Sequence, residues 1–401
     1  MTVHSISDKP SLGVYMQVPF CASKCTFCNF SSSVERSTIF DQYTRMLERE
    51  LADYLNLDSL CGISPNFISL PVDSIYMGGG TPALLGEERL RHVAHSLQDH
   101  LQLGAEVEFT LETTPGSASV SLLQALRAMG INRLSIGAQT FDEQELSAVG
   151  RLHTVPDTSD LVCQARQSGF PNISLDLIAG LPHQTEKSFR RSLETAVRLG
   201  PEHISLYLFE VDEKSRLGKE VVHGGNRYQA GAVPGDDFMA DAYESACAFF
   251  ASEGYNQYEI SNFALPGHES RHNRKYWQLA PYLGLGAGAH SFDGTRRWSN
   301  QSNVQNYLAK LDVRQSCIEE SHMLTTDEQV EEFFFLGLRQ VEGVNMQLAS
   351  ERWGAEYLTR WTEKIQRLED DGWLVSHDGW VRLTRPAYLV SNEIFQEFVS
   401  V

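Results

Sequence analysis

The chain has 401 residues, of which 42% are hydrophobic and 21% charged, and its formal net charge is −19. This composition is that of a folded globular protein with room for one large domain and a smaller one, and it excludes a disordered chain. The excess of acidic residues repels polyphosphates, so we expect no nucleic acid partner. There is no apolar run of about 18 residues and no secretory leader, so we expect a cytoplasmic protein.

The first half of the chain repeats one unit, a short apolar run followed by an amphipathic stretch of helical length. The predicted strands cover residues 13–18, 74–77, 107–112, 133–137, 173–178 and 203–209. The predicted helices cover residues 40–55, 87–101, 119–129, 142–149, 159–168 and 186–199. This alternation predicts an α/β fold with a parallel sheet, whose functional residues collect at the C-terminal ends of the strands.

The second half is less regular. A glycine-rich stretch, 224–235, reads as a surface loop, a helix is expected over 236–253, and the aromatic and glycine-rich segment 258–292 reads as folded loops. From about residue 325 the pattern predicts helices over 327–339, 346–353 and 357–371 and a hairpin around Asp378 and Gly379. Three helices and a hairpin resemble a winged helix, but the acidic run 369–371 argues against DNA binding, so we interpret this part as a packing or partner module.

Three of the seven cysteines, Cys21, Cys25 and Cys28, lie together in the loop after the first predicted strand. Three thiolates at this spacing can hold three corners of a cubane [4Fe-4S] cluster and leave the fourth iron open. A structural zinc site is the alternative, but it needs four ligands and no second C-x-x-C follows. The isolated cysteines are expected to be buried thiols: Cys61, Cys163, Cys247 and Cys317.

Further polar residues and glycines stand at the predicted strand ends. The run Gly78-Gly79-Gly80-Thr81 allows close approach of backbone to a ligand, or simply makes a tight turn. Glu112 can accept hydrogen bonds from a ligand or remain solvated. Gln139 and Asp176 interrupt apolar runs and are therefore either core hydrogen-bonding groups or ligand contacts. Arg151 can pair with a carboxylate or lie on the surface.

The motif C-x-x-x-C-x-aromatic-C after the first strand resembles the signature of the radical S-adenosylmethionine (SAM) superfamily. The resemblance implies a partial, TIM-like (β/α)6 barrel, a [4Fe-4S] cluster held by the three cysteines, SAM bound to the open iron, and an electron donor of the flavodoxin or ferredoxin type. In the subgroup that includes oxygen-independent coproporphyrinogen III oxidase, the positions that contact SAM are matched here by Tyr15, Phe27, Gly79, Gly80, Thr81, Glu112, Gln139, Arg151 and Asp176. With this resemblance the expected domains are the barrel over 1–235, an extension over 236–324, and a winged-helix-like domain over 325–401.

Two features distinguish branches of that subgroup. The oxidases usually carry another cysteine directly after the cluster motif, whereas Asn29 and Phe30 follow Cys28 here. The segment 272–277 is similar to the H-N-x-x-Y-W motif of the HemW-type haem chaperone branch. That similarity implies a protein that carries haem to membrane haem proteins such as respiratory enzymes, with a homodimer as one state and attachment at the membrane during delivery. The alternative is a radical SAM enzyme that decarboxylates coproporphyrinogen III or transfers a methyl group to haem.

His272 is the candidate haem ligand, because an imidazole can bind haem iron while Tyr276 and Trp277 offer flat apolar surface. The alternative is a histidine that only forms hydrogen bonds in an aromatic loop. His290 is expected to be a core histidine.

Three residues depart from the family pattern. Gln17 stands in place of a histidine, Thr114 in place of an asparagine, and Ser270 in place of a cysteine. The departure at Ser270 excludes a cysteine haem ligand there, and those at Gln17 and Thr114 lie on the side of the expected cofactor.

Overall fold

The computed structural model describes residues 10–55 and 65–399. Its main feature is a sheet of twelve strands in the order β12-β11-β10-β9-β1-β2-β3-β4-β5-β6-β8-β7. Neighbouring strands from β1 to β6 pair in parallel, as predicted. These six strands are β1 (Leu12–Gln17), β2 (Val72–Gly78), β3 (Leu103–Thr113), β4 (Arg133–Gln139), β5 (Asn172–Ala179) and β6 (His203–Leu208). The described part of the sheet has two free edges, β12 and β7, so it forms a partial barrel.

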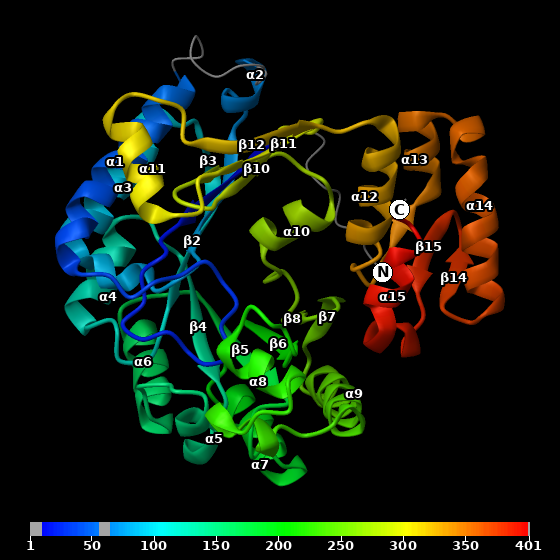
Figure 1. The fold of residues 1–401 in the computed structure, drawn as a ribbon, viewed down its shortest axis with the longest axis horizontal. Coiled ribbons are helices and arrows are strands. Elements are labelled where there is room, and N and C mark those ends of the chain that lie inside the picture. Colours follow the sequence, from blue (N-terminus) through cyan, green and yellow to red (C-terminus); the bar gives the residue numbers. More distant parts are fainter. Residues whose placement is uncertain (1–9, 56–64, 400–401) are drawn as a thin grey trace.

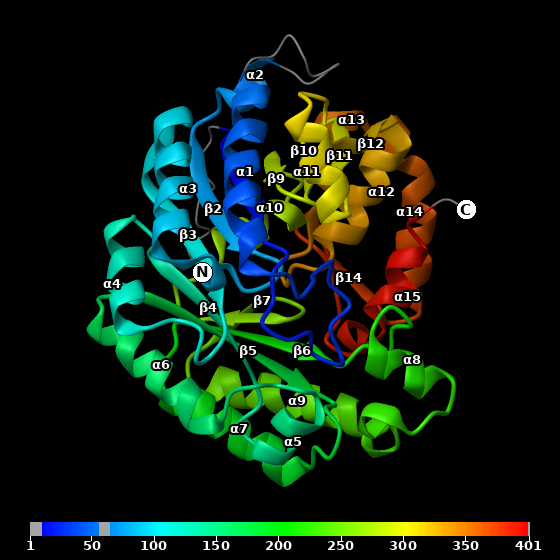
Figure 2. The ribbon, with the colours of Figure 1, turned by 60° about the vertical axis from the view of Figure 1, so that its left-hand side comes forward.

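Helices between the strands cover the outer face of this curved sheet (Figures 1 and 2). They are α1 (Phe40–Leu55), α3 (Gly86–His100), α4 (Val120–Ala128), α5 (Glu143–Ala148), α6 (Val155–Gln167) and α7 (Glu186–Arg198), with a short α2 (Pro65–Ile68) and 3-10 turns over Ser37–Ile39 and Pro82–Leu85. Their starts are marked by capping side chains. Thr185, for example, forms a capping box with Ser188 at the start of α7, which satisfies amide groups that the first turn leaves open.

The segment 258–292 corrects one prediction, because it is not a set of irregular loops. On the β6 side of the sheet it contributes two antiparallel strands, β7 (Asn256–Glu259) and β8 (Asn262–Ala264). On the β1 side it contributes β9 (Tyr282–Leu285), which pairs in parallel with β1, and β10 (His290–Phe292), which is antiparallel to β9. The sheet continues with β11 (Arg296–Asn300) and β12 (Ile318–Met323), and α9 (Asp236–Ser252), α10 (Arg271–Trp277) and α11 (Val304–Asp312) complete this region. Most of the new strands have three or four residues, too few to show a period of two.

The glycine-rich stretch after β6 is also more ordered than predicted. A short helix, α8 (Arg216–Val222), precedes it, and a 3-10 segment (Arg227–Ala232) lies within it.

The C-terminal part confirms the predicted helices and hairpin. It contains α12 (Thr326–Gly337), α13 (Met346–Trp353), α14 (Ala355–Asp370) and α15 (Ser391–Gln396), strands β13 (Val344–Asn345), β14 (Leu374–His377) and β15 (Trp380–Leu383), and a 3-10 turn (Pro386–Val390). Asp378 and Gly379 connect β14 to β15 with positive φ angles of 50° and 79°, as a two-residue hairpin turn requires. Phe334, Trp361 and Phe398 stack in the core of this part.

None of the helices in the described ranges is both long enough and apolar enough to span a bilayer.

Candidate functional site

A cavity of about 670 Å³ lies at the C-terminal ends of β1 to β6. The residues predicted to bind the cluster and SAM all line it: Tyr15, Cys21, Cys25, Phe27, Cys28, Gly79, Gly80, Thr81, Glu112, Gln139, Arg151 and Asp176. They come from positions scattered over more than 160 residues of sequence, and the strand order brings them together at one end of the sheet. His272 does not line this cavity.

The three cysteines of the loop after β1 are free thiols, each partly exposed at the cavity. Burial raises the pKa of the Cys21 thiol, and hydrogen bonds from Ser32 and Thr81 offset only part of this increase. Within residues 10–55 and 65–399 no three His, Cys, Asp or Glu side chains are close enough together to hold a single metal ion. A cubane cluster takes each thiolate on a different iron. Three free thiols around one cavity fit that donor set.

Two glycines after β2 hold this loop close to the sheet. A Cβ atom on Gly80 would lie 2.6 Å from the carbonyl oxygens of Val18 and Phe20, so only glycine allows this packing. Gly79 has a φ of 90° and donates its N–H to Glu112 Oε2 at 2.9 Å. The glycine run therefore positions the cysteine loop and the Glu112 carboxylate together.

Two carboxyl groups and one guanidinium meet inside the cavity. Glu112 accepts from Tyr76 at 2.9 Å, and burial together with the charge of Asp176 raises the pKa of Glu112 to about 7. Ser135 Oγ lies 3.3 Å from each oxygen of Asp176, whose pKa is also raised by burial. Arg133 is 1% exposed, and its Nε has no hydrogen-bond partner. These groups can accept from, or pair with, an amine, hydroxyl or carboxylate on a bound ligand.

Arg151 joins the end of β4 to the cysteine loop. Its guanidinium donates to the carbonyl oxygen of Gly137 at 2.6 Å and lies 3.4 Å from Cys25 Sγ. A third contact, at 3.3 Å, reaches His153 Nδ1. Arg151 is therefore part of the cavity wall and not an isolated surface charge.

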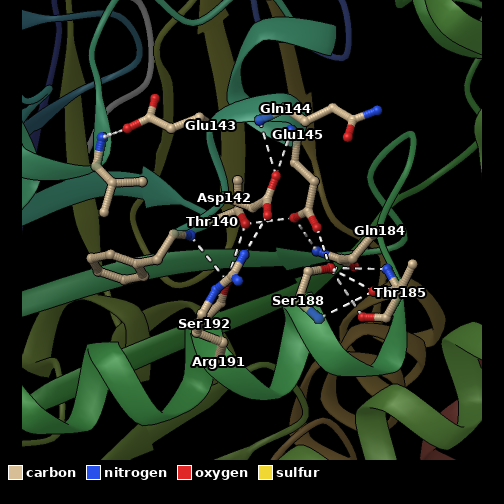
Figure 3. A network of polar contacts seen from close by, with 12 residues as sticks. Thr140, Asp142, Glu143, Gln144, Glu145, Gln184, Thr185, Ser188, Arg191 and Ser192 are labelled. Carbon is tan, nitrogen blue, oxygen red and sulfur yellow. Dashed lines mark hydrogen bonds and ion pairs between the residues drawn. The ribbon is translucent and has the colours of Figure 1, made fainter.

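A buried acid, Glu145, holds the end of β4 through a network of polar contacts (Figure 3). Glu145 does not line the main cavity. Glu145 is 1% exposed and accepts hydrogen bonds from Thr140, Gln184 and Ser188. Thr140 follows Gln139, whose backbone has a positive φ of 67°. Gln184 also contacts Gly180 N and Ile178 O at the end of β5. The Glu145 network thus ties the end of β4, at Gln139, to the end of β5, the strand that carries Asp176.

The structure places His272 behind the cavity wall. Its ring packs against Tyr15 and Tyr76, with centroids 6.2 and 5.4 Å away. Nδ1 lies 3.1 Å from Ser74 Oγ and Nε2 lies 2.9 Å from Tyr276 OH. Burial, with the charges of Lys275 and Arg133, lowers the pKa of His272 to about 3, so the ring is neutral. Both ring nitrogens are therefore engaged within the protein.

Other expectations about single residues have mixed outcomes. His290 is exposed, so its prediction as a core histidine is wrong: its side chain points outward at the start of β10. Cys247 and Cys317 are buried, as predicted, but Cys163 is exposed on α6. Cys61 lies outside the described residues.

The three departures from the family pattern occupy defined places. Gln17 accepts from Tyr15 OH at 2.6 Å and donates to Ser31 O at 3.2 Å, so it links β1 to the cysteine loop. Ser270 is the N-cap of α10 and accepts from Asn273 N. Thr114 lines the cavity beside Glu112.

Several cavity residues were missed from the sequence. Arg133 and Tyr76 lie within predicted strands, and a charged residue at the start of an apolar run was the available signal for Arg133. The C-terminal part supplies another portion of the wall through Tyr388, Leu389, Ser391 and Asn392. Nothing in the local sequence of that part indicates that it faces the cluster loop.

Known proteins resemble the chain over nearly its whole length. The sequence pattern described as "Radical SAM superfamily" matches residues 16–196, and that of "HemN C-terminal domain" matches residues 324–390. "Heme chaperone HemW" of Bacillus subtilis is 35% identical over 96% of this chain and 98% of that protein. The protein of the same name from Lactococcus lactis is 31% identical over 98% of both. The solved structure of coproporphyrinogen III oxidase (HemN) from Escherichia coli superposes with a TM-score of 0.83 at 24% identity, over 97% of this chain and 90% of that one, and thus shares the fold.

Proposed function

Because the chain belongs to the HemW family of the radical SAM superfamily, we propose that it is a haem chaperone that binds haem and delivers it to haem proteins of the membrane. The observation that carries this proposal is the similarity to heme chaperones over 96% of the chain at 35% identity. The cluster loop agrees with it. Coproporphyrinogen III oxidases usually have a further cysteine there, as C-x-C, and Phe30 stands at that position here and is 67% exposed. Asn29, between Cys28 and Phe30, donates to Asp212 at 3.0 Å.

For the cofactors, membership of the superfamily implies a [4Fe-4S] cluster and SAM, and the cavity supplies groups that fit them. We propose Cys21, Cys25 and Cys28 as the cluster ligands. When bound, the cluster and SAM would supply one-electron chemistry at the cavity.

The remaining cavity residues would hold SAM in place. We propose that Glu112 accepts from the SAM amino group and that Arg151 pairs with its carboxylate. Gln139 and Asp176, at neighbouring strand ends, would accept from its hydroxyl groups. The other SAM contacts of the proposal are Tyr15, Phe27, Gly79, Gly80 and Thr81.

For haem, we propose the cavity rather than the His272 ring as the place of the porphyrin. Ligation of iron by His272 would require its contacts with Ser74 and Tyr276 to be given up. Apolar side chains that are 67% and 75% exposed, Phe30 and Leu152, stand among the residues of the cavity, and exposed apolar surface at a cavity is typical of a site for an apolar ligand. In this proposal His272 supports the cavity wall behind Tyr15 and Tyr76.

Delivery to a membrane acceptor, reduction by a flavodoxin- or ferredoxin-type donor and formation of a homodimer are further parts of the proposal. The division into a barrel over 1–235, an extension over 236–324 and a C-terminal domain over 325–401 also remains a proposal.

The test is haem titration of the anaerobically reconstituted protein, followed by the Soret band. We expect saturable binding by the wild type and by His272→Ala, and transfer to an apo haem protein. Absence of a Soret shift in the wild type would refute the chaperone function, and loss of binding in a folded His272→Ala would refute the cavity as the haem site. Incubation with coproporphyrinogen III, SAM and a reductant tests the alternative, because an oxidase would form a decarboxylated product. We expect no such product.

A further inference from the structure

A second cavity, of about 340 Å³, lies where the C-terminal part meets β7. It is lined by Gln257, Val341, Val375, Arg382, Leu383, Thr384, Arg385 and Tyr388. No residue in this set was singled out from the sequence. Its lining combines valine, leucine and tyrosine residues with two exposed arginines.

The two arginines lack anionic partners. Arg382, on β15, and Arg385, just after it, have no hydrogen bond or ion pair from their side chains to any residue in the described ranges. Nearby arginines of α14 differ, because Arg360 pairs with Asp327 and Arg367 with Glu397. In a chain with 52 acidic and only 33 basic residues, two exposed arginines that line one cavity without an anionic partner among the described residues are available to an anionic ligand.

The second cavity shares a wall with the first. Tyr388 lines both of them and is 8% exposed. Burial raises the pKa of the Tyr388 hydroxyl, while the charges of Arg382 and Arg385 lower it, since both guanidinium groups are close. Gln257, in the second cavity, donates at 2.8 Å to the hydroxyl of Tyr243, which lines the first. The two cavities therefore lie next to each other, with Tyr388 between them.

We propose that Arg382 and Arg385 bind the propionate carboxylates of the haem whose ring occupies the main cavity, and this inference rests on the proposed haem chaperone function. A haem is a flat apolar ring with two carboxylates at one edge, so it needs apolar surface and, beside it, cationic donors. The planar guanidinium fork matches a carboxylate through two parallel hydrogen bonds. The carboxylate end would enter the arginine cavity past Tyr388, and the ring would remain on the side of Phe30 and Leu152.

The experiment compares haem with haem dimethyl ester, in which both carboxylates are blocked, in the same detergent solution. The proteins are wild type, Arg382→Gln/Arg385→Gln, and Arg198→Gln as the control, because Arg198 is exposed on α7 and lines neither cavity. We expect the double variant to bind haem about tenfold more weakly than the wild type, since each partly solvated pair contributes modestly. The double variant and wild type should bind the ester equally, and Arg198→Gln should behave as the wild type with both ligands.

Three outcomes would overturn the inference. The first is equal affinity of the wild type for haem and for its ester, which needs no variant and so does not depend on folding. The second is an unchanged haem affinity in the double variant. The third is a double variant that loses affinity equally for haem and for its ester, because the loss would then not depend on the carboxylates. Failure of the wild type to bind either porphyrin refutes the proposed function itself and is distinct from all three.

Discussion

At the scale of single residues, the backbone of Gln139 carries an unusual conformation. Its φ of 67° lies in the left-handed region, and its side-chain Nε2 would be 2.6 Å from a Cβ placed on Gly137, so the side chain folds back over that glycine. A residue with a Cβ costs about 1 kcal/mol or more in this region, whereas glycine does not. A glutamine at this position therefore costs conformational free energy that a glycine would not, and such strained residues are common at ligand sites.

We predict that Gln139→Gly and Gln139→Ala separate binding from stability. Both lose the side chain and should bind SAM more weakly, measured by the change in the cluster EPR signal on adding SAM. Urea unfolding should show Gln139→Gly to be about 1 kcal/mol more stable than Gln139→Ala, because only the glycine is relieved of strain. Equal stabilities would show that the positive φ carries no cost.

Glu112 gives a pH dependence whose sign follows from its environment. Burial and the charge of Asp176 raise the pKa of Glu112 from 4.5 to about 7. Without ligand, the folded protein holds this proton longer than the unfolded chain, so the resulting stabilisation is complete below pH 4.5 and is lost as the pH rises through about 7. An ammonium ligand reverses the preference, because it needs the ionised carboxylate.

We therefore predict that SAM affinity rises about tenfold as the pH increases through about 7, and that Glu112→Gln removes this rise. Equilibrium SAM binding between pH 6 and 8 measures it, and the variant's thermal stability at each pH serves as the control. A wild-type affinity that is independent of pH would contradict the proposed pairing of Glu112 with the SAM amino group.

At the scale of elements, the six strands β1 to β6 and their helices were predictable, because each strand is long enough to show an apolar run and each helix shows its own period. Strands β7 to β10 could not be predicted, because they have only three or four residues and lie among glycines and aromatic residues. Glu112, Gln139 and Asp176 were predictable as polar residues near strand ends. Tyr15 and Phe27 came only from the family resemblance, and Arg133 and Tyr76 were missed. The position of His272 behind the cavity wall could not be predicted, since its Nδ1 partner, Ser74, is 198 residues away in sequence and no local pattern reveals that contact.

The Glu145 network tests how the ends of two strands are held (Figure 3). We predict that Glu145→Ala lowers the free energy of unfolding by about 3 kcal/mol, because Thr140, Gln184 and Ser188 lose a buried acceptor. SAM affinity should fall as well, since Gln139 and Asp176 follow the positions of these strand ends. Urea unfolding and SAM binding measure the two effects.

The matched control is Glu143→Ala in the same helix. Glu143 is exposed and accepts only from Val155 N at 2.8 Å among the described residues, so the expected loss of stability is below about 1 kcal/mol. SAM binding should be unchanged in this variant. If Glu145→Ala were as mild as Glu143→Ala, the network would not support the strand ends.

At the scale of the whole molecule, the C-terminal part is joined to the sheet and lines part of the main cavity. The sequence predicted its helices and hairpin but treated it as a separate module. Glu259 of β7 pairs through a β-bridge with Gln340, and Tyr388 and Asn392 line the same cavity as the cluster loop. Such contacts between distant segments depend on three-dimensional packing and leave no periodic signal in the chain.

One ion pair at this junction tests whether the two parts unfold together. Glu259 is fully buried, and its Oε2 lies 3.6 Å from the guanidinium of Arg339, which also stacks 4.5 Å from the Trp277 ring. Burial raises the pKa of Glu259, and the charge of Arg339 lowers it again. Removal of the arginine would leave a buried acid without its counter-ion, and this is more costly than the absence of both charges.

We predict that Arg339→Ala destabilises the protein by about 3 kcal/mol and that the double variant Arg339→Ala/Glu259→Gln recovers at least half of this loss. Glutamine can still accept from Ser261 N, as Glu259 does at 2.9 Å, while carrying no charge. Urea unfolding followed by both circular dichroism and tryptophan fluorescence should give one transition in the wild type and the double variant. If the double variant were no more stable than Arg339→Ala, stacking on Trp277, and not the charge of Glu259, would hold the C-terminal part to the sheet.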